Sequence, residues 1–86
     1  MHTVELLEEA IDVARRLGYH VRVEPLDGHA GYCVVAGKKL LLVDLAAGPA
    51  ERLDTVLDAL REDAAIEPGD LSSTLQRLLG RRKAAA

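Results

Sequence analysis

Asp27, His29 and Cys33 are the residues of this chain whose types and spacing come closest to a chemical site. The order Asp27-x-His29-x3-Cys33 offers an oxygen, a nitrogen and a sulfur ligand, and these are the donors that zinc takes in proteins. A structural zinc site needs four donors, and the sequence has neither a second cysteine nor a His-x3-His pair. We therefore interpret His29 as a loop residue and Cys33 as a small core residue. A metal- or small-ligand-binding module that uses these residues is the alternative function.

Cys33 with His20 or His29 is the nucleophile and base pair that the chain offers. An imidazole on a strand adjacent to Cys33 could reach the thiol, but no residue is identifiable that would orient the base or bind an oxyanion. The glycines on either side of His29 match neither the phosphate-binding loop nor the dinucleotide fingerprint. We therefore predict no catalytic residue, no cofactor and a chain that is not an enzyme.

Three segments with helical periodicity would help to position these residues. Apolar residues recur at spacings of three and four over Val4–Leu17 and over Pro49–Asp63, and Gly18 supplies a stop for the first helix. Ser73 and the glutamine three residues later resemble a capping box. They predict a last helix over Ser73–Leu79, which Gly80 would end.

Three segments with a period of two predict strands over Tyr19–Glu24, Gly31–Ala36 and Lys39–Leu45. Gly37-Lys38 fits a two-residue hairpin turn between the last two. The element order α-β-β-β-α-α predicts an α+β fold, a three-stranded antiparallel meander with the helices packed on one face. We expect one domain over residues 1–80 and a frayed basic tail over 81–86.

The net charge of the chain and its expected cellular compartment limit the kinds of partner that it could have. The net charge of -3 argues against a nucleic-acid partner, and acidic stripes on the first two helices are interpreted as solvated faces. A single cysteine indicates a reducing compartment, and the longest apolar run, Leu40–Val43, is too short to cross a bilayer. With an acidic N-terminal segment in place of a signal peptide, we expect a cytoplasmic chain without a membrane partner. Eight arginines against three lysines favour a GC-rich bacterial coding sequence.

The third predicted strand is apolar on both faces, although a meander places it at an edge of the sheet. Either the last helix covers Leu41 and Val43, or the strand pairs with its copy in a second chain to form a six-stranded sheet. A chain of this length has little core, and oligomerisation is a common remedy. We therefore predict an interface at Leu41 and Val43 and a homodimer. The predicted function is that of a small non-enzymatic domain acting through protein contacts.

The succession of a glycine-terminated helix, a strand, a glycine-rich loop, a hairpin and a second helix resembles the early part of the ImmA/IrrE-type zinc peptidases. The helix of those enzymes that carries HExxH corresponds to a helix with Asp58, Ala59 and Glu62 at the three motif positions. Both metal ligands and the general base are thus replaced. The resemblance implies a similar order of elements and no peptidase activity.

Overall fold

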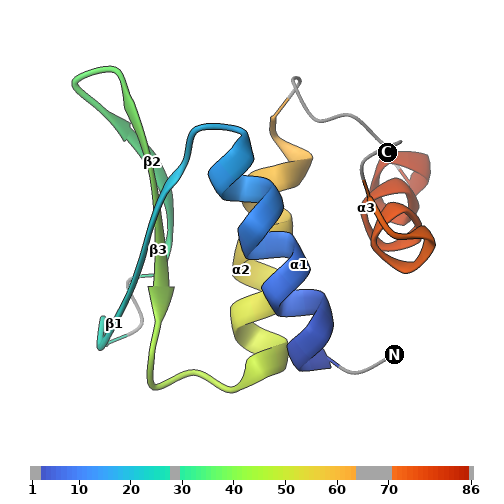
Figure 1. Cartoon of the computed structure of the whole chain (residues 1–86), viewed down its shortest axis with the longest axis horizontal. Coiled ribbons are helices and arrows are strands. Elements are labelled where there is room, and N and C mark those ends of the chain that lie inside the picture. Colours follow the sequence, from blue (N-terminus) through green and yellow to red (C-terminus); the bar gives the residue numbers. More distant parts are fainter. Residues whose placement is uncertain (1–2, 28–29, 64–70, 86) are drawn as a thin grey trace.

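The computed structural model describes residues 3–27, 30–63 and 71–85 and contains a three-stranded sheet with three helices (Figure 1). The elements in chain order are α1 (Thr3–Arg16), β1 (His20–Glu24), β2 (Gly31–Val35), β3 (Lys38–Asp44), α2 (Pro49–Arg61) and α3 (Ser73–Ala85). The predicted α+β class is confirmed, with α1 and α2 packed on the sheet and α3 packed against α2.

The antiparallel meander is wrong, because the strand order in the sheet is β1-β3-β2. The central strand β3 runs antiparallel to β2, with Val35 opposite Lys38, and parallel to β1, with His20 opposite Leu40. A central strand has its backbone paired on both edges and its side chains flanked by those of two neighbours, although only another layer covers a face. This position gives β3 the shelter that an edge position would have denied it, and it leaves β1 and β2 as the edges.

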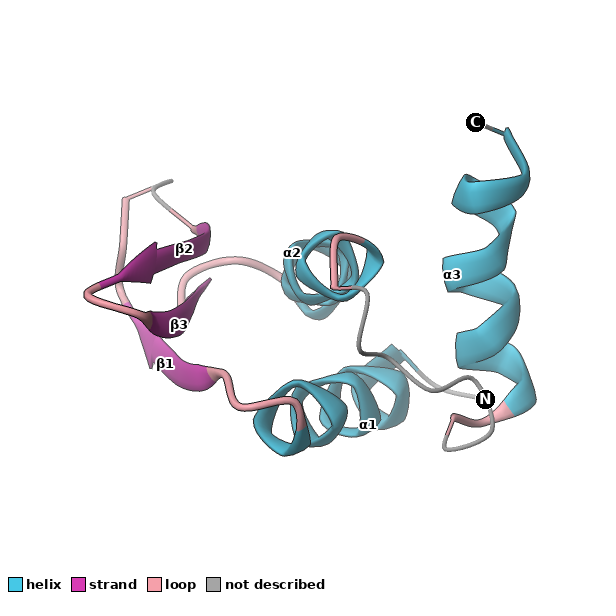
Figure 2. Ribbon diagram, turned by 90° about the horizontal axis from the view of Figure 1, so that it is seen from above, coloured by secondary structure: helices cyan, strands magenta, loops and turns pink. Residues whose placement is uncertain are grey.

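The molecule has three layers, and one face of the sheet is bare among the described residues. In Figure 2, α1 and α2 lie side by side on one face of the sheet, and α3 lies on the far side of the helix layer. α1 packs against β1, whereas α2 packs against β2 and β3. The core between sheet and helices contains Leu41, Val43, Val56, Leu57 and Leu60, each at most 2% exposed. No described segment covers the opposite face of the sheet.

Gly18 ends α1 as predicted. Its φ is +97°, and the N–H groups of Gly18 and Tyr19 donate to the carbonyls of Arg15 and Ala14 at 3.0 Å each. This pattern is a Schellman motif, which needs a residue in the left-handed region and therefore favours glycine. It turns the chain sharply so that β1 begins beside the end of α1.

The last helix begins as predicted but is capped by the preceding residue. The Ser72 hydroxyl accepts a hydrogen bond from the Leu75 N–H at 3.2 Å, and the Ser72 hydroxyl and N–H donate to Glu9 at 2.7 Å each. Ser73 is therefore not the capping residue, and Gln76 bonds the Leu71 carbonyl instead. α3 also continues through Gly80 to Ala85, so the predicted stop at Gly80 is wrong.

The hairpin turn lies one residue earlier than predicted. Ala36 and Gly37 form it, with φ values of +52° and +78°. Two successive positive φ angles define the type I′ turn, whose twist matches that of the strands it joins. Gly37 is suited to this conformation, whereas Ala36 holds it at a steric cost.

Candidate functional site

The three predicted ligands do not form a site among the described residues. Asp27 is exposed in the loop after β1, and His29 lies outside the described residues. Cys33 is exposed in the middle of β2, so its interpretation as a core residue is wrong. Cys33 pairs with Leu40 of β3. The next residue of β3, Leu41, faces the helices, and side chains alternate along a strand. Leu40 and Cys33 therefore point to the bare face. In the described part of the chain, no three His, Cys, Asp or Glu side chains are placed to hold a metal ion.

His20 and Cys33 are held apart by the central strand. Leu40 of β3 pairs with His20 on one side and with Cys33 on the other. All three residues therefore lie in one row on the bare face, with His20 and Cys33 two strand spacings apart, about 10 Å. A thiol and a base must come within hydrogen-bond distance to act together. The expected adjacency of their strands is contradicted by the strand order.

Leu41 and Val43 lie on the opposite face of β3 from the one that is open. Both are 0% exposed in a single copy of the chain, because the layer formed by α1 and α2, of which α2 packs against β3, covers them. The cover comes from these two helices and not from the last helix. Their neighbours Leu40 and Leu42 point to the bare face and are half-buried. The two residues named as an interface thus belong to the core, and other residues must form any contact with a second chain.

The two edge strands differ in charge. β2, with the sequence GYCVV, carries no charged residue, and Val34 is 66% and Val35 54% exposed. Tyr32 and Cys33 are exposed as well. β1 carries Arg22 and Glu24, joined by an ion pair of 2.7 Å. Charges on an edge strand discourage pairing with another strand, and β2 lacks this protection.

The backbone of β2 presents free hydrogen-bonding groups at the edge of the sheet. Val35 and Lys38 flank the two-residue turn and pair with each other, so their backbone groups bond across the hairpin. In an antiparallel pair of strands, hydrogen-bonded and non-hydrogen-bonded residue pairs alternate. The N–H and C=O groups of Tyr32 and Val34 therefore point away from β3. No described segment lies beyond β2. The edge is therefore a template for a further strand.

A polar cluster at the start of β3, beside the hairpin, has a structural role. Lys39 Nζ lies 2.9 Å from Asp63 Oδ2 and donates to the Leu17 carbonyl at 3.0 Å. The ammonium also lies 4.9 Å from the centre of the Tyr19 ring. Burial, followed by the neighbouring Asp63 carboxylate, raises the pKa of Tyr19 to about 12. These contacts join the ends of α1 and α2 to the sheet, and sequence reasoning missed them because the partners are far apart in the chain.

The residues at the HExxH positions show no ligand arrangement. Asp58 and Glu62 are exposed, Ala59 is buried in the core, and Arg61 binds Asp58 at 3.0 Å. Among the helices of the described ranges, none combines the length and apolar character that a bilayer crossing requires. No family model, curated protein or solved structure matches this chain.

Proposed function

We propose that this chain is a small non-enzymatic protein-interaction domain that pairs the edge of β2 with β2 of a second copy. The observation that supports this function is the uncharged, exposed β2 edge, where the backbone groups of Tyr32 and Val34 point outward. Pairing supplies hydrogen-bond partners to those groups and withdraws valine side chains from water. This proposal keeps the homodimer that the sequence predicts, but it places the interface at β2 and not at Leu41 and Val43 of β3.

The geometry of β2 suits a two-fold axis through Cys33. Antiparallel pairing about this axis places Cys33 opposite Cys33 of the partner subunit, in a pair without mutual hydrogen bonds. It places Tyr32 opposite Val34 of the partner subunit, in a hydrogen-bonded pair on each side of the axis. All five residues of β2 then have a partner, and the two sheets join into one of six strands.

A second copy fits this edge better than it fits the edge of β1. Pairing β1 with its own copy about its central residue sets Arg22 opposite Arg22 of the partner subunit, and like charges directly opposite are destabilising. β2 brings no charge to the contact, so its copy meets no repulsion. An 86-residue chain has few residues for a hydrophobic core, and the described residues leave one face of its sheet uncovered. A contact between copies adds buried apolar area.

Analytical ultracentrifugation tests the proposal. At about 50 µM protein we expect a mass near twice the 9.3 kDa of one chain, since small interfaces commonly reach micromolar Kd. Val34→Lys places a charge on the edge and should lower the dimer affinity at least about tenfold. Val4→Lys is the matched control, because Val4 is 51% exposed on α1, away from β2. A monomer at this concentration, or equal loss of dimer in both variants, would refute the proposal.

A further inference from the structure

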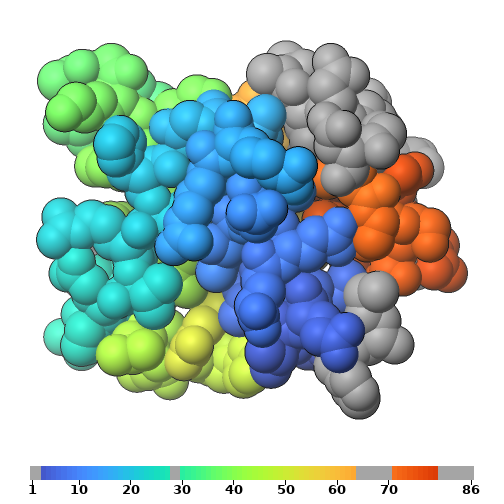
Figure 3. Space-filling model, viewed as in Figure 1, coloured from blue at the N-terminus to red at the C-terminus, as the bar shows by residue number. Residues whose placement is uncertain are grey.

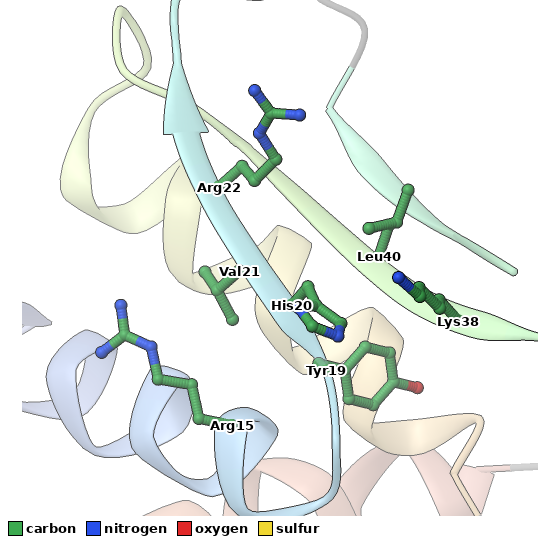
Figure 4. Close-up of a pocket in the computed structure, with 7 residues that line it drawn as sticks. All are labelled: Arg15, Tyr19, His20, Val21, Arg22, Lys38 and Leu40. Carbon is green, nitrogen blue, oxygen red and sulfur yellow. The ribbon is translucent and has the colours of Figure 1, made fainter. Parts of the chain in front are cut away.

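A shallow depression of about 510 Å³ surrounds the first half of β1, at the sheet edge opposite β2 (Figure 4). Arg15 of α1 and Val21 line it from the helix side of β1, and His20, Arg22, Lys38 and Leu40 line it from the bare face. The depression reaches both faces because β1 is an edge strand. The depression is open to solvent, so a ligand would lie along the edge of the sheet and not inside a closed cleft.

The lining is basic in a chain that is acidic overall. Arg15, His20, Arg22 and Lys38 are four of its seven residues, and none of the seven is acidic. With eleven Lys and Arg and three His in 86 residues, a random set of seven would hold about one basic residue. Clefts lined by one sign of charge concentrate ions of the opposite sign. The three cationic side chains, Arg15, Arg22 and Lys38, therefore favour an anionic ligand.

The basic side chains are accessible to a ligand. Arg15, His20, Arg22 and Lys38 are all exposed, and in Figure 3 the residues of β1 (cyan) and α1 (blue) lie together on the near face of the molecule. Arg22 uses its Nε for the 2.7 Å bond to Glu24, which leaves the two terminal guanidinium nitrogens for another acceptor. Lys39 is different, since its ammonium already binds Asp63 and a carbonyl. Lys38 has no such contact among the described residues.

The apolar part of the lining indicates what else the ligand carries. Leu40 is half-buried on the bare face, and the buried Tyr19 lies at the start of β1. Guanidinium and ammonium groups are the usual protein donors to phosphate oxygens. We infer that the depression around β1 binds a small phosphorylated molecule. Its phosphate groups are attracted by Arg22 and Lys38 on the bare face and by the charge of Arg15 on the helix side of β1, and its remainder lies against Leu40.

This site is independent of the contact proposed for β2. β1 and β2 are opposite edges of the sheet, so a dimer formed through β2 leaves one depression open at each far end. Loss of the dimer in Val34→Lys should therefore leave ligand binding intact. A failure of one proposal is distinguishable from a failure of the other.

Titration of ¹⁵N-labelled protein with pyrophosphate, ADP and adenosine tests the site. We expect amide signals of residues 19–22 and 38–40 to shift with pyrophosphate and ADP, at a Kd of about 1 mM or below, and not with adenosine. The double variant Arg22→Ala/Lys38→Ala should weaken binding at least about tenfold. All the substituted side chains are exposed, so the variants should keep the melting temperature of the parent.

Arg15 and Arg16 supply a matched pair of controls on one helix. Arg15 lines the depression, whereas Arg16 does not and instead lies 3.3 Å from Asp12. Arg15→Ala should weaken ADP binding several-fold, and Arg16→Ala should leave it unchanged. The inference is overturned if pyrophosphate shifts no signal in this region at about 10 mM, if adenosine binds as well as ADP, or if the two single variants behave alike.

Discussion

Lys39 and Asp63 meet 2.9 Å apart, joining the central strand to the residues that follow α2. The Asp63 side chain is only 7% exposed, so this carboxylate is largely shielded from water where it meets Lys39. We expect Asp63→Asn to lower the free energy of unfolding by about 1–3 kcal/mol, because the substitution leaves the Lys39 ammonium without a carboxylate. Urea denaturation measures the change.

Asp12→Asn is the control for this pair. Asp12 binds Arg16 on the surface, with a side chain that is 68% exposed. Exposed pairs contribute little, so the control should change stability by less than about 0.5 kcal/mol. Equal effects of the two substitutions would show that the Lys39–Asp63 contact does not hold the sheet and helices together.

The raised pKa of Tyr19 predicts a loss of stability in alkali. Burial and then Asp63 raise this pKa from 10.0 to about 12. Below pH 10 the phenol of Tyr19 is neutral in both the folded and the unfolded state, and its contribution to the free energy of unfolding is fully present. Between pH 10 and pH 12 the unfolded state loses the proton first, so stability falls as pH rises through this window.

Tyr32→Phe isolates the signal of Tyr19, because the chain has only two tyrosines. In that variant the absorbance of the phenolate should rise with a midpoint near pH 12 in the folded protein. Tyr19→Phe should flatten the part of the stability profile between pH 10 and pH 12 that belongs to this phenol. A midpoint near pH 10 in folded protein would contradict the burial of Tyr19.

Leu40 and Leu41 are neighbours on opposite faces of β3, and they test its orientation. Leu41 is completely buried under the helices, so Leu41→Ala should cost about 2–5 kcal/mol. Leu40 is half-buried on the bare face, and Leu40→Ala should cost about 1 kcal/mol. Thermal denaturation of both variants gives the comparison. A larger loss for Leu40→Ala would mean that β3 presents the other face to the helices.

Ala36 offers a gain in stability. It holds a φ of +52° in the type I′ turn, where asparagine is favoured, so Ala36→Asn should stabilise the chain by about 0.5–1 kcal/mol. Ala30 is exposed and has no positive φ, so Ala30→Asn should give no such gain. A melting temperature that is unchanged by Ala36→Asn would argue against this turn.

Local patterns predicted most of the elements, because periodicity and stop signals act over a few residues. Gly18 marks the end of α1 by its own conformational freedom. Gly80 failed as a stop because a glycine can lie within a helix at a modest cost. The cap of α3 was placed one residue late because Ser72 and Ser73 are adjacent serines of equal capping propensity.

The strand order required information that alternation does not contain. Leu40–Val43 is apolar on both faces, and this signal also fits a central strand with neighbours on both sides. Assigning β3 to an edge turned that signal into a predicted interface at buried residues. The absence of charge from Gly31–Val35 was visible in the sequence, but it acquires meaning only once β2 is known to be an edge.

Disulfide trapping at Cys33 tests the β2 contact most directly. A two-fold axis through Cys33 puts the two Cα atoms about 4.5 Å apart, within the range that a disulfide spans. With copper phenanthroline and oxygen as oxidant, we predict rapid formation of a covalent dimer through the chain's single cysteine, slowed by Val34→Lys and unaffected by Val4→Lys. Cross-linking that is absent, or equally fast in both variants, would contradict the proposed pairing of β2 with its copy.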